Sequence, residues 1–215
     1  MTEKLLLTLA KSYPFTERDA GEFRSLKASG ITFSVRSYTA KGLGHVSVMT
    51  ASSFFGLMRM DTLIVNPLER DLPLYSYDRV HAMGNDTLIV ELYDTLLGSV
   101  DLGKVRSVKD AFADLPDHPL GAHWYDDIKL PESVSKKGKK AETPRFDTLT
   151  EQHFTALLAC APDRLCDQNA KREKASVYVE GLLTHGGPST DTFLKALGRE
   201  KTERLFRTVL FGTEV

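Results

Sequence analysis

An acidic residue, Asp78, lies in the middle of a segment that otherwise has the pattern of a sheet strand, PLYSYDRVHA (residues 73–82). Side chains alternate between the two faces of a strand, so Asp78 shares its face with Leu74, Ser76 and Val80. If that face is solvated, the carboxylate is an ordinary surface charge. If the face lines a pocket, burial raises the carboxyl pKa and makes Asp78 a proton donor near neutral pH. The alternation leaves both possibilities open.

Signatures of other common chemistries are missing from the sequence. The KGLG turn (41–44) holds a G-x-G but lacks the third glycine and the following helix of a dinucleotide site, and no P-loop motif occurs. The six histidines never pair at metal-binding spacing, so we expect no metal site. No G-x-S-x-G nucleophile motif is present. Carboxylates and histidines on strands and helix ends are the remaining candidates.

Composition narrows the classes of function. The chain has 215 residues, 41% of them hydrophobic, and a net charge of −1 without a basic tail, so nucleic-acid binding is not expected. The apolar runs are too short for a membrane span or a secretory signal, which predicts a cytoplasmic location. Cys160 and Cys166 fit neither a disulfide framework nor a zinc site and are predicted to be free thiols.

The elements that position these residues divide the chain into a strand-rich first half and a helical second half. Alternating, β-rich segments predict strands at 31–40, 45–53, 61–67, 73–82 and 86–94. Their connectors are short turns, so the strands should form an antiparallel meander. Strands followed by helices predict an α+β layered fold, which we interpret as a single domain over residues 1–215.

Apolar spacing at helical intervals predicts the helices of the chain. We expect them at 15–28, 103–115, 150–161, 170–187, 188–198 and 199–212. Between the halves, the segment 129–146 is polar, rich in lysine and marked by Gly and Pro, which predicts an exposed loop.

Three segments, in the same order along the chain, resemble motifs of the ferredoxin-dependent bilin reductases. DLPLYSYDRV (71–80) is similar to the strand that carries the catalytic aspartate of that family, and it follows a proline-marked turn after LIVNP. HWYDD (123–127) lies where those enzymes have a tryptophan after the sheet. YVEGLLTH and FLKALGREKTERLFRTVLFG (193–212) look like the C-terminal signature. The chain is therefore identified as a divergent member of this family, whose wider superfamily includes red chlorophyll catabolite reductase.

This resemblance implies a fold and a reaction. The fold would be a three-layer α/β/α sandwich with a central antiparallel sheet, holding an open-chain tetrapyrrole such as biliverdin between the sheet and the C-terminal helices. The enzymes that the chain resembles bind no flavin, metal or nicotinamide. A [2Fe–2S] ferredoxin delivers single electrons, and protein carboxyl groups deliver protons through substrate radicals. Asp78 would be the proton donor, and the partners would be reduced ferredoxin and the bilin.

The sequence departs from the family pattern at the other acids. Asp61 and Thr62 stand where phycocyanobilin-forming members have a histidine, and Asp61 is similar to an acid of the chlorophyll-catabolite branch. A second family aspartate would fall at Gly186 or Gly187, for which Asp191 and His185 are the nearest substitutes. We predict that these residues complete the catalytic site. The alternative is that Asp191 only favours a helix start and His185 a helix end.

Other side chains are predicted to bind the tetrapyrrole. Thr62, and Ser76 on the face of Asp78, are two of them. Arg36 and Arg79 suit propionates, because a guanidinium binds a carboxylate with two hydrogen bonds. His45, at the start of a strand, is a further candidate. For Arg36, Arg79 and His45 the alternative is an ordinary place on the surface or edge of the sheet.

Two further expectations concern the surroundings of the site. Glu91, in LIVELYD, is predicted to face solvent or a helix. The lysines 136, 137, 139 and 140 are expected to be solvated or to steer the acidic ferredoxin. We expect a monomer. The second hypothesis is a binding protein that holds a tetrapyrrole without reducing it, because fold does not determine function and two family acids are missing.

Overall fold

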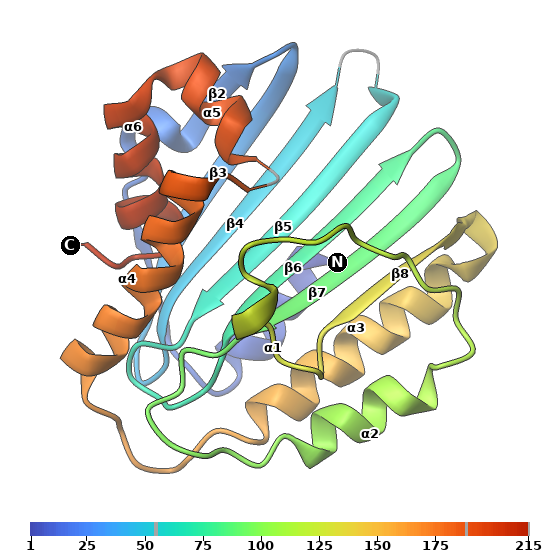
Figure 1. Cartoon of the computed structure of the whole chain (residues 1–215), viewed down its shortest axis with the longest axis vertical. Coiled ribbons are helices and arrows are strands. Elements are labelled where there is room, and N and C mark those ends of the chain that lie inside the picture. Colours follow the sequence, from blue (N-terminus) through green and yellow to red (C-terminus); the bar gives the residue numbers. More distant parts are fainter. Residues whose placement is uncertain (54–55, 188, 215) are drawn as a thin grey trace.

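A computed structural model of the chain describes residues 1–53, 56–187 and 189–214. Within these residues eight strands form one antiparallel sheet, in the order β1-β3-β4-β5-β6-β7-β8, with β2 also paired to β3 (Figure 1). The strands are β1 (Phe15–Arg18), β2 (Ser25–Ala28), β3 (Ile31–Ala40), β4 (Gly44–Ser53), β5 (Met58–Asn66), β6 (Leu74–Ala82), β7 (Asn85–Tyr93) and β8 (Val134–Lys139).

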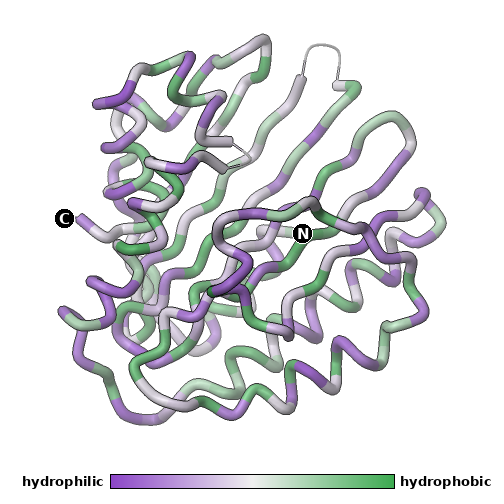
Figure 2. Tube along the Cα trace, viewed as in Figure 1, coloured by the Kyte–Doolittle hydropathy of each residue, from purple (hydrophilic) through white to green (hydrophobic). Residues whose placement is uncertain are grey.

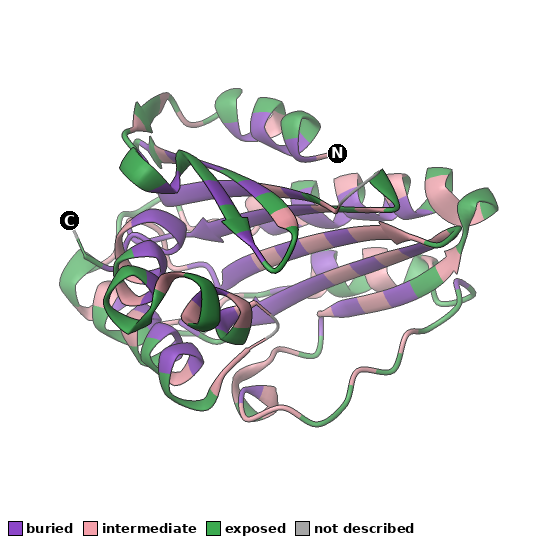
Figure 3. Ribbon diagram, turned by 90° about the horizontal axis from the view of Figure 1, so that it is seen from above, coloured by how far each residue is buried: buried purple, intermediate pink, exposed green. Residues whose placement is uncertain are grey.

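Helices cover both faces of the sheet and complete three layers. One face is covered by α1 (Thr2–Ala10), α2 (Gly103–Ala111) and α3 (Thr143–Leu158). The other is covered by α4 (Gln168–His185), α5 (Thr190–Leu197) and α6 (Arg199–Arg204), which continues into a π-helical turn, Leu205–Leu210. Seen from above, the sheet lies between these helices and its central strands are mostly buried (Figure 3). The predicted α+β sandwich with an antiparallel sheet is confirmed.

Each face of the sheet has its own hydrophobic core. We call the face under α1 to α3 the closed face; its core includes Val48, Leu63, Tyr77 and Val90. We call the face under α4 to α6 the cavity face. Hydrophobic and hydrophilic residues alternate along α2 and α3 (Figure 2), as expected for helices with one side on the sheet.

A two-residue turn sets the register between β6 and β7. Met83 and Gly84 have positive φ angles of 52° and 73°, the conformation that suits the twist of a tight hairpin. The turn pairs Ala82 with Asn85 and, further along, Ser76 with Glu91 and Asp78 with Ile89. The positions of the acids on the cavity face follow from this register.

The five predicted central strands are confirmed, whereas two predictions at the sheet edges were wrong. The segment 15–28 is no helix but β1, a 3₁₀ turn (Gly21–Arg24) and β2. The segment 129–146 contains β8, an edge strand rich in lysine, which is a common way to protect an exposed edge. Lys136 is buried, and its Nζ donates to Leu115 O at 2.8 Å and to Asp117 at 2.7 Å. Short polar edge strands have too little alternation to be recognised.

The helices after residue 100 lie close to their predicted positions. The main differences are at the ends, because α2 stops at Ala111 and α3 begins at Thr143, seven residues before its predicted start. Within the described ranges, no helix has the length and apolar content needed to cross a membrane.

Candidate functional site

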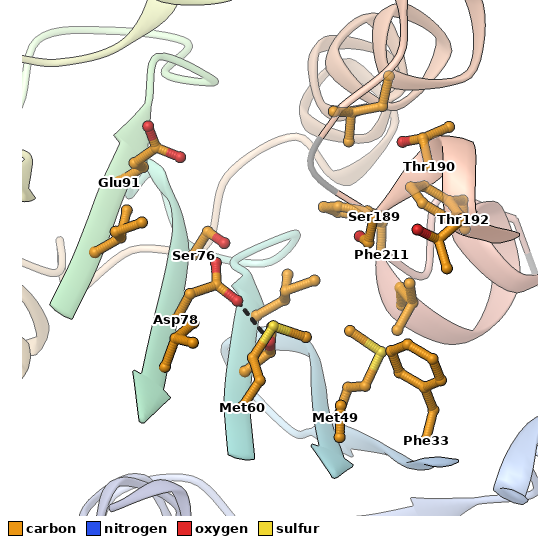
Figure 4. A pocket seen from close by; sticks show the side chains of 18 of the residues that line it. Phe33, Met49, Met60, Ser76, Asp78, Glu91, Ser189, Thr190, Thr192 and Phe211 are labelled. Carbon is orange, nitrogen blue, oxygen red and sulfur yellow. Dashed lines mark hydrogen bonds between the residues drawn. The ribbon is translucent and has the colours of Figure 1, made fainter. Parts of the chain in front are cut away.

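A cavity of about 280 Å³ lies on the cavity face of the sheet, beneath the C-terminal helices. Its volume is near the lower end of the range for small-molecule sites. The wall comes from β3 to β7, the segment 120–125, α4, the start of α5 and the segment 206–211. Most of the lining is apolar, and polar side chains interrupt it at few places, including Thr62, Ser76, Asp78 and Glu91 on the sheet and Ser189, Thr190 and Thr192 opposite them (Figure 4).

Asp78 projects from β6 into this cavity. Its cross-strand neighbour on β5 is Thr62, whose hydroxyl donates a hydrogen bond of 2.5 Å to Asp78 Oδ1. Desolvation by the apolar wall raises the pKa of Asp78 to about 6, and the nearby charge of Glu91 acts in the same direction. The hydroxyls of Thr62 and Ser76 oppose the shift without cancelling it. Asp78 can therefore hold a proton close to neutral pH.

Glu91 is a second acid in the cavity wall. Of its two predicted surroundings, solvent is wrong, because Glu91 is buried on the sheet face that helix α4 covers. It is 7% exposed and lies opposite Ser76. The hydroxyl of Tyr93 donates to Glu91 Oε2 at 2.6 Å, while Oε1 is buried without a hydrogen-bond partner. Lys129 Nζ lies 3.8 Å from Oε1. The tight turn at Met83 and Gly84 is the sequence signal that would have placed Glu91 beside Ser76.

Aromatic rings form the side of the cavity next to Glu91. Tyr93 stacks on Tyr178 of α4 with a centroid distance of 4.1 Å, and Tyr125 meets Tyr93 edge-on at 5.6 Å. Burial raises the pKa of all three phenols, so they stay protonated. These rings offer a flat ligand apolar faces and fixed edges.

The segment that carries Tyr125 is fastened to α4 by Trp124. The indole Nε1 donates to Gly186 O at 2.9 Å, and the ring lies on Gly181, where a Cβ atom would be only 2.1 Å from it. Only glycine permits this approach. The neighbouring His123 stacks on Tyr125 at 4.8 Å, lines the cavity and has a buried Nδ1 without a hydrogen-bond partner.

Three of the residues predicted from the sequence lie in the cavity wall together: Asp78, Thr62 and Ser76. Three others lie on the closed face. Asp61 is buried there beside Arg59 Nη2 at 3.1 Å, and Arg79 forms an ion pair with Asp86.

Arg36 also points away from the cavity, toward Glu3 of α1. Since neighbouring strand residues face opposite sides, none of these closed-face residues can turn toward the cavity without a change of register.

The remaining predicted residues lie on the C-terminal side but outside the lining. His45 is buried, and its Nε2 donates to Val209 O at 2.8 Å; burial lowers its pKa to about 4, which keeps it neutral. His185 is exposed at the end of α4, with its ring 5.6 Å from Trp124. Asp191 is exposed in the first turn of α5. Catalytic roles for Asp61, His185 and Asp191 stay predictions, and their positions do not favour them.

Comparison with known proteins finds similarity in fold only. No family model matches the chain, and no curated protein matches it in sequence. The crystal structure of phytochromobilin synthase from tomato in complex with biliverdin superimposes with a TM-score of 0.78 at 10% sequence identity. The match covers 99% of this chain and 82% of the tomato protein. The chain therefore has the fold of a bilin reductase.

Proposed function

We propose that this chain binds a linear tetrapyrrole such as biliverdin in the Asp78 cavity and reduces it. Two single-electron transfers from reduced [2Fe–2S] ferredoxin would supply the electrons, without a flavin, metal or nicotinamide held by the chain. Asp78 would donate a proton to the bound substrate. The observation that carries the proposal is a carboxyl group with a pKa near 6 in an apolar cavity, on the fold of an enzyme that binds biliverdin.

The cavity suits a flat, conjugated ligand with N–H groups. Tyr93, Tyr125 and Tyr178 offer aromatic surfaces, and the carboxyl groups of Asp78 and Glu91 provide acceptors on the sheet side. A protonated Asp78 can both hold a pyrrole system by a hydrogen bond and transfer a proton to it as electrons arrive. The apolar surroundings raise the fraction of Asp78 that is protonated near neutral pH, which makes a proton available to the substrate.

Anaerobic mixing of the purified protein with biliverdin tests binding and turnover separately. We expect a shift of the visible bilin spectrum on mixing, and loss of the biliverdin band when reduced ferredoxin is added. Asp78→Asn should retain the shift and lose turnover, whereas Glu180→Gln, at an exposed ion pair on α4, is the matched control with normal turnover. No spectral shift with the wild-type protein would sink the proposal for biliverdin.

A tetrapyrrole-binding protein without reductase activity is the second candidate. It is favoured by the positions of Asp61, His185 and Asp191, which leave the cavity with fewer of the expected proton donors. A spectral shift on mixing with biliverdin, without turnover at any ratio of reduced ferredoxin to protein, would support this candidate over the first.

A further inference from the structure

Reduction of one carbon–carbon double bond consumes two electrons and two protons. Once Asp78 has given its proton it is a carboxylate, and it cannot act again until it is reprotonated. Most of the cavity wall is apolar, and a bound ligand would cover the half-buried Asp78, which slows its direct reprotonation from solvent. A second group that carries protons inward would then serve the site. Glu91 is the only other carboxyl group among the described residues that line the cavity.

Glu91 lies at the boundary of two cavities. Besides the Asp78 cavity it lines a second cavity of about 260 Å³, whose wall includes His118, Asp126, Lys129, Ser133 and Ser135. This volume is several times the roughly 30 Å³ that one water molecule occupies in the liquid, and the wall is polar. Because Glu91 Oε1 is buried and has no hydrogen-bond partner, one of its oxygens is free to accept and release a proton.

Ser76 stands between the two acids. It is the cross-strand partner of Glu91 and lies two residues before Asp78 on the same face of β6. Figure 4 shows the Ser76 side chain between those of Glu91 and Asp78. The Ser76 hydroxyl also stabilises the charged form of Asp78. A hydroxyl can accept a proton from one side while it releases its own to the other.

We propose that Glu91 reloads Asp78 with protons from the second cavity, through the Ser76 hydroxyl. The inference rests on the proposed reductase function. Asp78 donates its proton to the bilin and becomes a carboxylate. The Glu91 carboxylate then takes a proton from solvent in the second cavity and passes it to Ser76, while Ser76 gives its own proton to Asp78, so that Glu91 ends as a carboxylate again. Each complete reduction uses two protons from solvent and two electrons from ferredoxin.

Other titratable groups face the same region and must be separated from Glu91. In the Asp78 cavity they are His123, Tyr125, Tyr178 and Tyr93, the last of which donates to Glu91; in the second cavity they are Lys129, His118 and Asp126. Burial raises the pKa of the Tyr93 phenol, as it does for the other two tyrosines. The raised phenol pKa values of Tyr125 and Tyr178 make them poor relays near neutral pH. His123 has a free buried Nδ1 and is the competitor that the test must include.

Rapid mixing of biliverdin-loaded protein with reduced ferredoxin separates the first proton transfer to the bilin from the transfers that require a reloaded Asp78. In Glu91→Gln, which retains an acceptor for the Tyr93 hydroxyl, we expect the first protonation to proceed at nearly the wild-type rate. Steady-state turnover should fall by about tenfold or more, within the range typical of lost proton transfer. Ser76→Ala should show the same pattern more weakly, and Glu180→Gln should behave as wild type.

A titration without substrate tests the coupling of the two acids independently of activity. Carbon-13 labelling of aspartate, with Asp78→Asn to assign the signal, follows the protonation of Asp78 in the folded protein. Because the charge of Glu91 raises the pKa of Asp78, Glu91→Gln should lower that pKa from about 6.

The outcomes separate this inference from the proposed function. If the wild-type protein does not reduce biliverdin, the proposed function fails, and an Asp78 titration that is unchanged in Glu91→Gln then overturns the coupling as well. If the wild-type protein reduces biliverdin, three results would overturn the inference. Glu91→Gln could keep the wild-type steady-state rate, or it could slow the first and the later protonations equally. His123→Gln, rather than Glu91→Gln, could be the variant that loses steady-state turnover while keeping the first protonation.

Discussion

The two faces of the sheet treat an ionisable side chain shielded from bulk water in opposite ways. On the closed face, Arg79 is 2% exposed, and its guanidinium pairs with Asp86 and lies 5.0 Å from the ring of Phe146. On the cavity face, the next residue back along β6, Asp78, has a hydroxyl for a partner and no cation among the described lining residues. The comparison teaches that a buried charge with a matched ion pair serves the fold, whereas an unmatched acid in a concave wall is a candidate for chemistry.

The difference arises from what covers each face. Phe146, Leu149 and Phe154 of α3 pack against Tyr75 and Tyr77 and fill the space over the closed face. The C-terminal helices leave a cavity between themselves and the sheet. A carboxyl group at its wall is shielded from bulk water but not neutralised, which is the physical cause of its raised pKa.

The largest expected effect is the loss of activity in Asp78→Asn. Removal of the proposed proton donor should lower the turnover number by about 10²–10⁴-fold, while biliverdin binding persists. Steady-state kinetics and spectral titration measure the two quantities. A similar loss in Asp61→Asn with the fold intact would break the comparison, because Asp61 lies on the closed face.

On the closed face the expected effect is on stability instead. Arg79→Met leaves Asp86 buried without its partner and should lower the free energy of unfolding by about 3–5 kcal/mol, measured by urea denaturation. The double variant Arg79→Met, Asp86→Leu should recover most of this loss, because no uncompensated charge remains. A single variant as stable as wild type would show that this ion pair does not support the fold.

The stability of the wild type relative to Asp78→Asn should depend on pH. The pKa of Asp78 is about 6 in the folded chain, whereas a carboxyl group of an unfolded chain has the usual value of 3.8. The folded protein therefore holds this proton more tightly, and the stability that the protonated Asp78 contributes is fully present below about pH 4 and is lost as pH rises through 6. Asp78→Asn should therefore match the wild type at pH 4 and exceed it at pH 8, by up to about 3 kcal/mol. Urea denaturation at the two pH values measures this, and equal differences at both would contradict the assignment.

The smallest effect is expected from the carboxylates of the proposed substrate, biliverdin. The described residues that line the cavity include no lysine or arginine, so the propionates of biliverdin have no ion pair to form there. Esterification of both propionates should change the dissociation constant less than about threefold, equivalent to under about 1 kcal/mol. Spectral titration with biliverdin dimethyl ester measures it. A much weaker ester complex would place cations, such as Lys129, in the binding site.

The central sheet was predictable because its signal is local. Alternation along β3 to β7 and short turns were enough to recognise five antiparallel strands and to place Asp78 and Arg79 on opposite faces. The edge strands were missed because they are short and polar. An edge strand pairs with another strand on one side only, so it needs less hydrophobic alternation than a central strand. The helix over Thr2–Ala10 was not predicted either.

The candidate site was predictable only in part. Asp78, Thr62 and Ser76 were found. Ser76 lies two residues before Asp78 and so on the same face of β6, and Thr62 is the partner of Asp78 on the neighbouring strand β5. Arg36, Asp61 and Arg79 were proposed for the same site although alternation places them on the closed face. Glu91 was overlooked because it belongs to the cavity only through pairing with β6, a contact between different strands.

By itself the sequence determined which residues alternate, where the tight turns fall, and therefore which acids share a face of the sheet. Tertiary structure alone decided which face is open. That choice depends on long-range contacts, such as Trp124 against Gly181 and His45 under Val209, that position the C-terminal elements. Those contacts join residues far apart in the chain, and no local pattern encodes the space that they leave beside Asp78.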